Sequence, residues 1–288
     1  LSWSVDVPAD AIQALGNGDL TVNASVTNQN GNTGSGTRDI TIDANLPGLR
    51  VDTVAGDDVV NIIEHGQALV VTGSSLGLAE GTPLTVTIND VEYTTAVQAD
   101  GSWSVGITAA QVSAWPAGAV NIAVSGESSA GNPISITHPV TVDLTPAAIT
   151  INTIATDDVI NAAEKGADLT LSGTTTNVEP GQTVTVTFGG KNYTASVASD
   201  GSWTATVPAA DLASLPEGSA SALASVSNIN GNSASAVHSY SVDSSAPTII
   251  INTVASDNIV NASEADAGVT VSGSTTAEAG QIVTVTLN

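Results

Sequence analysis

Residues 184–207 read Val184-Thr-Val-Thr-Phe-Gly-Gly-Lys-Asn-Tyr-Thr-Ala-Ser-Val-Ala-Ser-Asp-Gly-Ser-Trp-Thr-Ala-Thr-Val207. Apolar or β-branched residues alternate with Thr and Ser, which is the period of two expected of strands that bury one face. Gly189-Gly190 and Asp200-Gly201 interrupt the alternation, and both pairs supply residues that tolerate a positive φ in a hairpin turn. The stretch therefore predicts three antiparallel strands, each with one buried face.

Two short helical turns are expected beside these strands. Residues 208–215 place apolar side chains at Leu212 and Leu215, which is a helical spacing. Asn161 and Glu164 stand three residues apart, as the two partners of a capping box do. Residues 222–226 alternate again, and we expect about seven strands in each complete unit.

The chain repeats itself every 100 residues. Trp3, Trp103 and Trp203 have this spacing, and the last two each follow Asp-Gly-Ser. A shared period of this kind indicates tandem repeats. The same offset relates three other sets: the Gly-Asn pairs at 31–32, 131–132 and 231–232, the Asp residues at 43, 143 and 243, and the segments 57–64, 157–164 and 257–264.

Proline-containing stretches follow each Asp of the 43, 143 and 243 set and fix the backbone, as short interdomain linkers do. Division there predicts complete repeats at 46–145 and 146–245, the C-terminal part of a repeat at 1–45 and the N-terminal part of one at 246–288. A unit of about 100 residues with about seven strands has the size of an immunoglobulin-like β-sandwich. We therefore expect an all-β chain of tandem immunoglobulin-like sandwich domains.

The chain begins with Leu1-Ser2-Trp3, which is neither an initiator Met nor a signal peptide. We expect it to be a fragment of a longer protein. The sequence leaves open whether another molecule completes the two partial repeats.

The charge of the chain is strongly negative. Twenty-eight Asp and Glu residues stand against Arg38, Arg50, Lys165 and Lys191, so the formal net charge of the 288 residues is −24. Four cations cannot build a basic surface, which excludes a nucleic-acid binder. Cys is absent and aromatic residues are 3%, so neither disulfides nor a large aromatic core stabilises the fold. No apolar run reaches the ~18 residues of a membrane span, and no membrane insertion is expected.

Carboxylates and amides concentrate at the predicted ends of the strands. The topology of a seven-strand sandwich puts the segment 157–164 beside Asp243 at one pole. It puts Asp200 and residues 230–232 at the other pole, facing the carboxylates of the preceding repeat. Unpaired carboxylates repel one another, and a hard divalent cation relieves this. Ca²⁺, which takes about six to eight oxygen ligands, suits such a site better than zinc, which prefers Cys or clustered His.

A simpler interpretation stays open for the same residues. The Asn and Glu of segment 57–64 would only cap a helical turn, and the Asp residues would lie in solvated turns. Capping does not explain why an adjacent Asp-Asp pair recurs 100 residues later, so we favour calcium. On that view, replacing Asp157 and Asp158 by Ala removes a bound ion and leaves the calcium-free state as stable or more stable, because repulsion falls.

Several strings carry a resemblance to a known family: residues 151–164, Gly181-Gln-Thr-Val-Thr-Val-Thr, Asn192-Tyr-Thr-Ala and Asp200-Gly-Ser-Trp. Together they resemble the bacterial immunoglobulin-like repeats of giant non-fimbrial adhesins of the SiiE kind, which are exported by type I secretion. The resemblance covers essentially the whole chain. It implies an elongated, extracellular rod of sandwiches on the surface of a Gram-negative bacterium, with roles in cell adhesion, virulence and biofilm.

The resemblance also implies Ca²⁺ at or near the junctions between repeats. Asn258 replaces the second Asp of the third copy, which keeps an oxygen ligand but removes a charge, so a weaker site is expected there. The expected metal ligands are Asp43, Asp57, Asp58, Asn61, Glu64, Asp100, Asp143, Asp157, Asp158, Asn161, Glu164, Asp200, Asp243, Asp257, Asn258, Asn261 and Glu264.

We expect a non-enzymatic, calcium-binding stalk segment of a giant bacterial surface adhesin. Ca²⁺ would stiffen the junctions so that the rod projects adhesive regions to host cells or matrix. Its partners would be neighbouring repeats and, through the parent protein, a host-surface glycan or matrix. The alternative is that the repeats themselves bind glycan or protein ligands, as a lectin-like or biofilm-matrix module; the absence of a repeat-specific insertion or aromatic cluster favours the rod.

A catalytic interpretation has little support. Asp58 and Glu64 imitate the two carboxylates of a glycosidase, but they recur at a predicted junction rather than in a cleft, so no catalytic residue is expected. His138 and His238 occupy matching positions and are expected on a strand face. The tryptophans at the 100-residue spacing are expected in the core, whereas Trp115 replaces the Leu of the other copies and is expected to be partly exposed, as the candidate for contact with a ligand.

Overall fold

The computed structural model describes residues 1–287, so Asn288, the last residue of the expected part at 246–288, lies outside the described residues. The chain forms two compact units. Unit 1 holds residues 1–146 and the short segment 230–232. Unit 2 begins at Ala147 and holds the other described residues.

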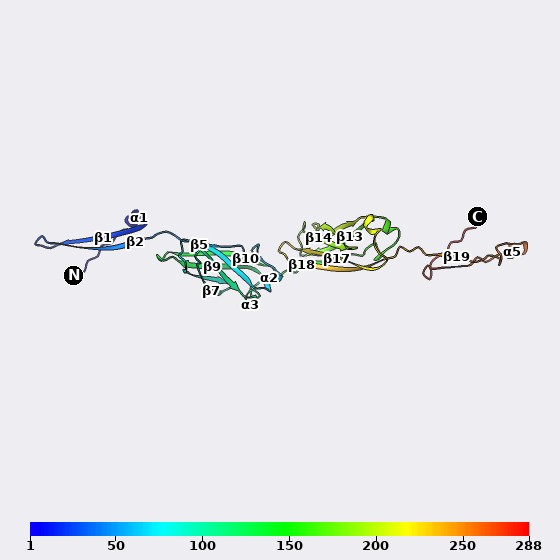
Figure 1. Ribbon diagram of the computed structural model, residues 1–288, viewed down its shortest axis with the longest axis horizontal. Helices are drawn as coiled ribbons and strands as arrows, with labels where there is room; N and C mark the ends of the chain where they lie inside the picture. The colour runs from blue at the N-terminus through cyan, green and yellow to red at the C-terminus, as the bar shows by residue number, and fades with distance from the viewer. Residues whose placement is uncertain (288) are drawn as a thin grey trace. The chain divides into compact units, whose positions relative to one another are not determined.

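Unit 1 contains a β-sandwich and a separate hairpin (Figure 1). Its strands are β1 (Gly18–Thr27), β2 (Thr33–Ile42), β3 (Gly48–Val51), β4 (Val59–Val60), β5 (Leu69–Leu76), β6 (Pro83–Ile88), β7 (Val91–Ala96), β8 (Ser102–Ile107), β9 (Gly118–Glu127) and β10 (Pro133–Val142), and its helices are α1 (Ala9–Leu15), α2 (Ile62–His65) and α3 (Ala109–Val112). One sheet has the order β4-β10-β9-β6-β7 and the other the order β3-β5-β8, while β1 pairs with β2.

Unit 2 repeats this sandwich. Its strands are β11 (Ala148–Ile149), β12 (Val159–Ile160), β13 (Leu169–Thr176), β14 (Thr183–Phe188), β15 (Lys191–Ser196), β16 (Ser202–Val207), β17 (Gly218–Ser227), β18 (Ser233–Val242), β19 (Ile249–Ile251) and β20 (Gly273–Thr275), and its helices are the 3-10 turn η1 (Glu164–Gly166), α4 (Ala209–Leu212) and α5 (Ala262–Ala267). The sheets have the orders β12-β18-β17-β14-β15 and β11-β13-β16, and β19 pairs with β20.

Each sandwich closes over one apolar core. In unit 2 this core takes side chains from both sheets, such as Leu171 of β13 and Val186 of β14. Burial alternates along β16, where Trp203, Ala205 and Val207 are buried and the residues between them are more exposed. The period of two in the sequence thus gives each sheet one face toward the core and one toward water.

The strands and turns expected from the sequence are largely confirmed. The segments 184–188, 203–207 and 222–226 fall within β14, β16 and β17, and the alternating segment 193–197 overlaps β15 and ends one residue beyond it. Helix α4 lies within 208–215, and η1 begins at Glu164. The all-β class is confirmed as well.

The expected count of about seven strands misses one short strand in each sandwich. Residues Val159–Ile160, expected in a loop, form β12 and pair in parallel with Ser241–Val242 of β18. The preceding strand β11 pairs instead with β13, in the other sheet. The chain therefore crosses between the sheets at this point and adds a short strand where a loop was expected, and β3 and β4 do the same in unit 1.

A glycine faces a tryptophan in each sandwich. Gly73 of β5 pairs with Trp103 of β8, and Gly173 of β13 pairs with Trp203 of β16. A Cβ atom on either glycine would overlap the indole and a main-chain carbonyl oxygen. Both indoles are 1% exposed, so the core position expected for these two Trp residues is confirmed. Glycine is required here for close approach of the indole.

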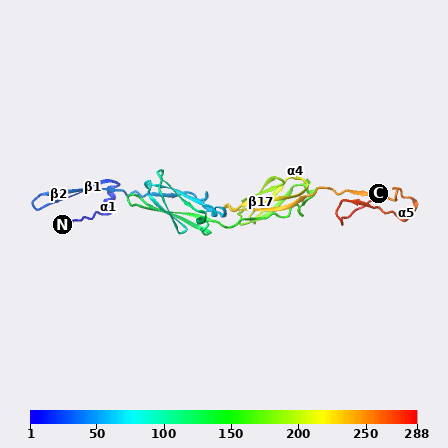
Figure 2. The ribbon, with the colours of Figure 1, turned by 60° about the horizontal axis from the view of Figure 1, so that its bottom comes forward.

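Two further parts have a single sheet each among the described residues: the N-terminal segment (residues 1–45) and the C-terminal segment (residues 246–287), which is drawn in orange and red in Figure 2. Their apolar side chains are exposed, for example Val26 of β1 and Ile249 of β19. Trp3 is 74% exposed, so its expected core position is wrong for this chain. The reason is that residues 1–45 lack the second sheet that buries Trp103 and Trp203.

Candidate functional site

The side chain of Asp58 closes the loop at residues 54–58. Asp58 has a φ of 63°, and its Oδ1 accepts a hydrogen bond of 2.8 Å from the Val54 N–H. Nε2 of His138, on β10, lies 2.8 Å from the same oxygen. Burial opposes ionisation, but the hydrogen bonds with His138 and Val54 outweigh it and lower the pKa of Asp58. Ile154, Asp158 and His238 repeat the arrangement in unit 2.

The Asn and Glu residues form capping boxes, as their spacing predicts. The Asn61 N–H donates to Oε2 of Glu64, and the Glu64 N–H donates to Oδ1 of Asn61, both at 3.1 Å. The same two hydrogen bonds recur in the other copies, Asn161 with Glu164 and Asn261 with Glu264. Asp57, Asp157 and Asp257 each accept a hydrogen bond from the N–H two residues further on.

Oxygen atoms of the linkers converge on an Asn amide at two places in unit 1. Nδ2 of Asn132 donates to the main-chain oxygens of Asp43 at 2.9 Å and Asn45 at 3.1 Å. Nδ2 of Asn232 donates to the main-chain oxygen of Asp143 at 3.0 Å and to its Oδ2 at 3.2 Å. At each of the two places, one Asn side-chain amide therefore donates hydrogen bonds to two oxygen atoms of a linker.

The Asp143 carboxylate has further partners. Nδ2 of Asn230 donates to its Oδ2 at 2.7 Å, and the Thr145 N–H donates to its Oδ1 at 2.9 Å. The hydrogen bond from Asn230, joined by those from Thr145 and Asn232, outweighs burial and lowers the pKa of Asp143. The Ile62 N–H donates to Oδ1 of Asn232 at 2.8 Å, which fixes the orientation of that amide.

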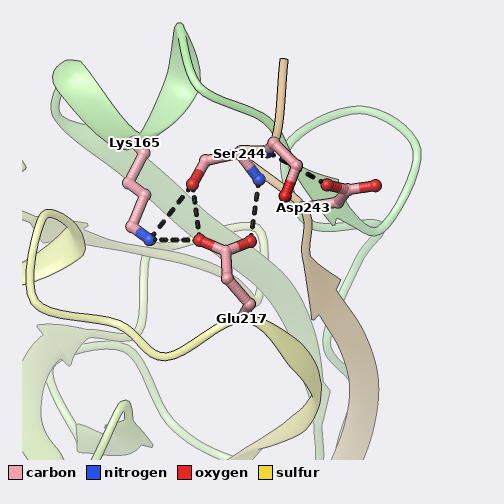
Figure 3. Close-up of polar contacts among 5 residues, drawn as sticks. Lys165, Glu217, Asp243 and Ser244 are labelled. Atoms are coloured by element: carbon pink, nitrogen blue, oxygen red, sulfur yellow. Dashed lines mark hydrogen bonds and ion pairs between the residues drawn. The ribbon is translucent and has the colours of Figure 1, made fainter. Parts of the chain in front are cut away.

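An ionic cluster that the sequence did not predict lies next to Asp243 (Figure 3). Nζ of Lys165 lies 2.8 Å from Oε1 of Glu217, while the Ser244 N–H donates to Oε2 of Glu217 at 2.8 Å. The hydrogen bonds from Lys165 and Ser244 lower the pKa of Glu217 to about 2. Asp243 itself accepts a hydrogen bond from the Ser245 N–H at 3.1 Å. The sequence holds one sign of this cluster: Lys165 replaces the His65 found 100 residues earlier, and it is one of only four cationic Lys and Arg residues in the chain.

The remaining expected ligands close turns. Asp100 and Asp200 accept hydrogen bonds from the hydroxyl and N–H groups of Ser102 and Ser202, which lower the pKa of both Asp residues. Asp43 accepts hydrogen bonds from the N–H and Nδ2 of Asn45. In the third copy, Asn258 accepts a hydrogen bond from the Val254 N–H at 3.0 Å.

The expected ligands are thus not drawn into one carboxylate cluster. Within residues 1–287, no group of three or more Asp, Glu or His side chains is arranged to hold a metal ion. The atoms that do converge, around Asn132 and Asn232, are main-chain carbonyl oxygens and one carboxylate. Such hard oxygen donors fit Ca²⁺ and do not fit zinc.

Trp115 is not a surface residue. Its side chain belongs to the core of the unit 1 sandwich and is 3% exposed. The expectation that it is partly exposed and touches a ligand is therefore wrong, because the side chain packs into the apolar core. Nε2 of His65 lies 3.0 Å from the main-chain oxygen of Trp115.

No family model and no curated protein sequence matches the chain. Solved structures do match. A Ca²⁺-stabilised adhesin that helps an Antarctic bacterium to reach out and bind ice is 34% identical over 96% of this chain and 69% of its own, with a TM-score of 0.47. A bacterial immunoglobulin-like domain from the ice-binding adhesin of M. primoryensis is 35% identical over 34% of this chain and 99% of that domain, with a TM-score of 0.28. The chain belongs to the bacterial immunoglobulin-like repeats of large adhesins.

A third adhesin-repeat relative is part of a 1.5-MDa bacterial ice-binding adhesin retained on its host cell surface. It is 32% identical over 84% of this chain and 80% of its own, with a TM-score of 0.45. Sequence identity over these lengths, rather than the superposition, carries the assignment. The expected immunoglobulin-like sandwich is thereby confirmed. No helix within residues 1–287 is both long enough and apolar enough to cross a membrane.

Proposed function

We propose that this chain is a non-enzymatic, calcium-binding stalk segment of a giant bacterial surface adhesin exported by type I secretion. In this proposal, complete repeats span 46–145 and 146–245, with parts of repeats at 1–45 and 246–288. Ca²⁺ stiffens the linkers between repeats, and the resulting extracellular rod carries adhesive regions to host cells or matrix, with roles in virulence and biofilm.

The convergence of linker oxygens on one amide is the observation that carries the calcium proposal. The main-chain oxygens of Asp43 and Asn45 both lie within 3.1 Å of Nδ2 of Asn132. In the next copy, Nδ2 of Asn232 contacts two oxygens of a single residue, the main-chain oxygen and the carboxylate of Asp143. A site that already gathers oxygen atoms of a linker needs little rearrangement to hold a hard cation.

The net charge of −24 supports the same proposal. Asp43, Asp143 and Asp243 recur at the start of each linker, where an ion would offset their charge. When bound, Ca²⁺ would supply positive charge and would coordinate several oxygen atoms of the linker at once. The carbonyl oxygens and the Asn side chains would hold the linker in one conformation around it.

Small-angle X-ray scattering with 1 mM Ca²⁺ and with EDTA tests the stiffening directly. We expect the maximum dimension and the apparent stiffness to fall in EDTA, while circular dichroism of the strands stays constant, because each sandwich has its own core. The proposal fails if scattering is the same in both buffers. Mg²⁺ in place of Ca²⁺ is the control, since it accepts irregular oxygen sets poorly.

Calorimetric titration of calcium identifies the residues involved. Asp143→Asn keeps the shape of the side chain and removes its charge, and we expect at least about tenfold weaker binding at one site. Asp90→Asn removes one charge from an exposed hairpin turn with a φ of 60° and serves as the matched control. Equal titrations of the two variants would mean that Asp143 is not a ligand.

A glycan array with the isolated chain addresses the stalk role. A stalk segment is expected to bind no glycan at micromolar concentration. Reproducible binding to one glycan class would instead support the lectin-like alternative, which has lost its candidate contact residue because Trp115 is buried.

A further inference from the structure

The chain leaves the last long strand of the two complete sandwiches in different ways. Leu144 follows β10 by two residues and packs against the apolar core of unit 1. Ser244 follows β18 by two residues, and its N–H donates to Oε2 of Glu217 at 2.8 Å. An apolar contact therefore holds the start of one linker, and a hydrogen bond to a carboxylate holds the start of the other.

The residues that form the second contact differ together from their counterparts 100 residues earlier. Unit 2 has Lys165, Glu217 and Ser244 in place of His65, Ala117 and Leu144. Ala117 has no side-chain acceptor, and Nε2 of His65 lies instead 3.0 Å from the main-chain oxygen of Trp115. These positions of unit 1 consequently form no ion pair.

The three side chains come from separate parts of unit 2 and turn toward one another (Figure 3). Glu217 precedes β17, whose first residue Gly218 pairs with Val242, so Glu217 lies beside the start of the linker. Nζ of Lys165, on η1, lies 2.8 Å from Oε1 of Glu217 and 3.4 Å from Oγ of Ser244. The Ser244 hydroxyl donates to the same Oε1. Glu217 therefore joins the lysine to both polar groups of Ser244.

Burial keeps Lys165 in this place. Its side chain is 16% exposed, whereas that of Lys191 is 56% exposed. A buried ammonium group without a partner is costly, so Lys165 requires the Glu217 carboxylate. Since Glu217 is 47% exposed, ions of the solvent reach the pair from one side and screen it.

A neutral form of the same hydrogen bond occurs elsewhere in the chain. Asn17 stands 200 residues before Glu217, and its Oδ1 accepts a hydrogen bond of 2.9 Å from the N–H of Ala44, the counterpart of Ser244. An acceptor at this repeat position thus holds the start of a linker in two copies. The ionic form, with a lysine behind the acceptor, belongs to unit 2.

We propose that Lys165 and Glu217 are positioning residues, which together with Ser244 form an ionic strap that holds the start of the linker 243–248 on unit 2 and opens as the ionic strength rises. The linker after β10 starts from the contact of Leu144 with the core, which carries no charge, and it keeps its conformation in salt. The strap contains no metal, so it stands apart from the calcium proposal. Two linkers of one chain thus respond to different solution conditions.

Hydrogen exchange of the Ser244 N–H, measured by NMR on the whole chain in EDTA, tests the strap directly. The Asp243 N–H next to it donates to the main-chain oxygen of Ile160 at 3.0 Å and is the internal control. Raising NaCl from about 10 mM to about 1 M shortens the screening length from roughly 30 Å to roughly 3 Å. We expect exchange of the Ser244 N–H to accelerate at least about threefold relative to that of Asp243.

Substitutions at Lys165 separate the charge from the packing of the side chain. Lys165→Met keeps most of the apolar stem and removes the ammonium group, so exchange at Ser244 should be fast at low salt and should no longer depend on salt. Lys165→Arg keeps the charge and should retain most of the protection. Lys191→Met removes the exposed partner of Asp211, outside the strap, and should leave exchange at Ser244 unchanged.

A spin label compares the two linkers in the same chain. The chain has no Cys, so Ser245→Cys and Thr145→Cys each give a single labelling position, and both residues are exposed. In EDTA, we expect the label at 245 to become more mobile in about 1 M NaCl and with Lys165→Met, and the label at 145 to respond to neither.

Three results overturn the proposal. The first is exchange at Ser244 that does not change with salt in the wild-type chain, a measurement that requires no variant to fold. The second is acceleration of Asp243 by the same factor, because the end of β18 then opens and the strap is not what salt releases. The third is an equal response of the labels at 145 and 245 to salt.

Discussion

Nε2 of His138 lies 2.8 Å from Oδ1 of Asp58, although 80 residues separate them, and His238 stands 2.7 Å from Asp158 in the next repeat. The same Asp oxygen receives the N–H of the loop residue four positions earlier. Each Asp therefore fastens its own loop to the last long strand of the sandwich. This role belongs to the folding of a single repeat and requires no metal.

Substitutions at Asp58 should show this fastening. Asp58→Asn keeps an oxygen that accepts the Val54 N–H, as Asn258 does for Val254. Asp58→Ala loses both hydrogen bonds and puts an Ala at a φ of 63°. We expect Asp58→Ala to lower the free energy of unfolding by about 2 kcal/mol and Asp58→Asn by less than about 1 kcal/mol. Urea unfolding in EDTA measures both, and equal losses would contradict the proposed role.

The glycine under Trp103 should tolerate no side chain. Gly73→Ala puts a methyl group into the indole and into a main-chain carbonyl oxygen, so we expect a loss of about 2–3 kcal/mol in the free energy of unfolding. Gly106→Ala, on β8 of the same sandwich, meets nothing within 4 Å and is expected to be neutral within about 0.5 kcal/mol. Similar losses in the two variants would mean that strand propensity, and not the indole, requires Gly73.

Glu217 should make unit 2 sensitive to acid. Its pKa is about 2 in the fold, below the ordinary value of 4.5, so its stabilising contribution is complete above about pH 4.5 and is lost as the pH falls toward 2. Glu217→Gln should abolish this part of the pH dependence. Urea unfolding between pH 5 and 2.5 measures the difference between the two proteins. Glu92→Gln, on the exposed face of β7, is the control; a constant difference between wild type and Glu217→Gln across the range would contradict the shift.

The double substitution of Asp157 and Asp158 by Ala now has a different expected outcome. The sequence alone predicts equal or greater stability of this variant in the absence of calcium, because like charges are removed. In the structure Asp158 accepts the Ile154 N–H and contacts His238, and Asp157 accepts the Val159 N–H. We therefore expect a lower melting temperature in EDTA. Asp157→Asn with Asp158→Asn removes the same charges, keeps the acceptors and should recover most of the loss.

Much of this molecule follows from the sequence alone. The alternation in residues 184–207 and the 100-residue period predict the strands and the repeated sandwich. The capping box of Asn61 and Glu64 follows from their spacing as well. These features are predictable because each depends on groups a few residues apart, whose geometry is set by the backbone conformation they share.

The partners of the acidic residues depended on the tertiary structure. Asp58 meets His138, Asp143 meets Asn230 and Asn232, and Glu217 meets Lys165 and Ser244, all across at least 27 residues of sequence. The crossing of the chain between sheets after β3 and β11 produces the additional parallel strands β4 and β12. Spacing along the chain carries no information about such contacts, because the folding of the chain in space decides which distant groups lie together. The sequence therefore identified the recurring carboxylates. Only the tertiary structure determined their role, which for most of them is to accept hydrogen bonds that stabilise loops and turns within one repeat.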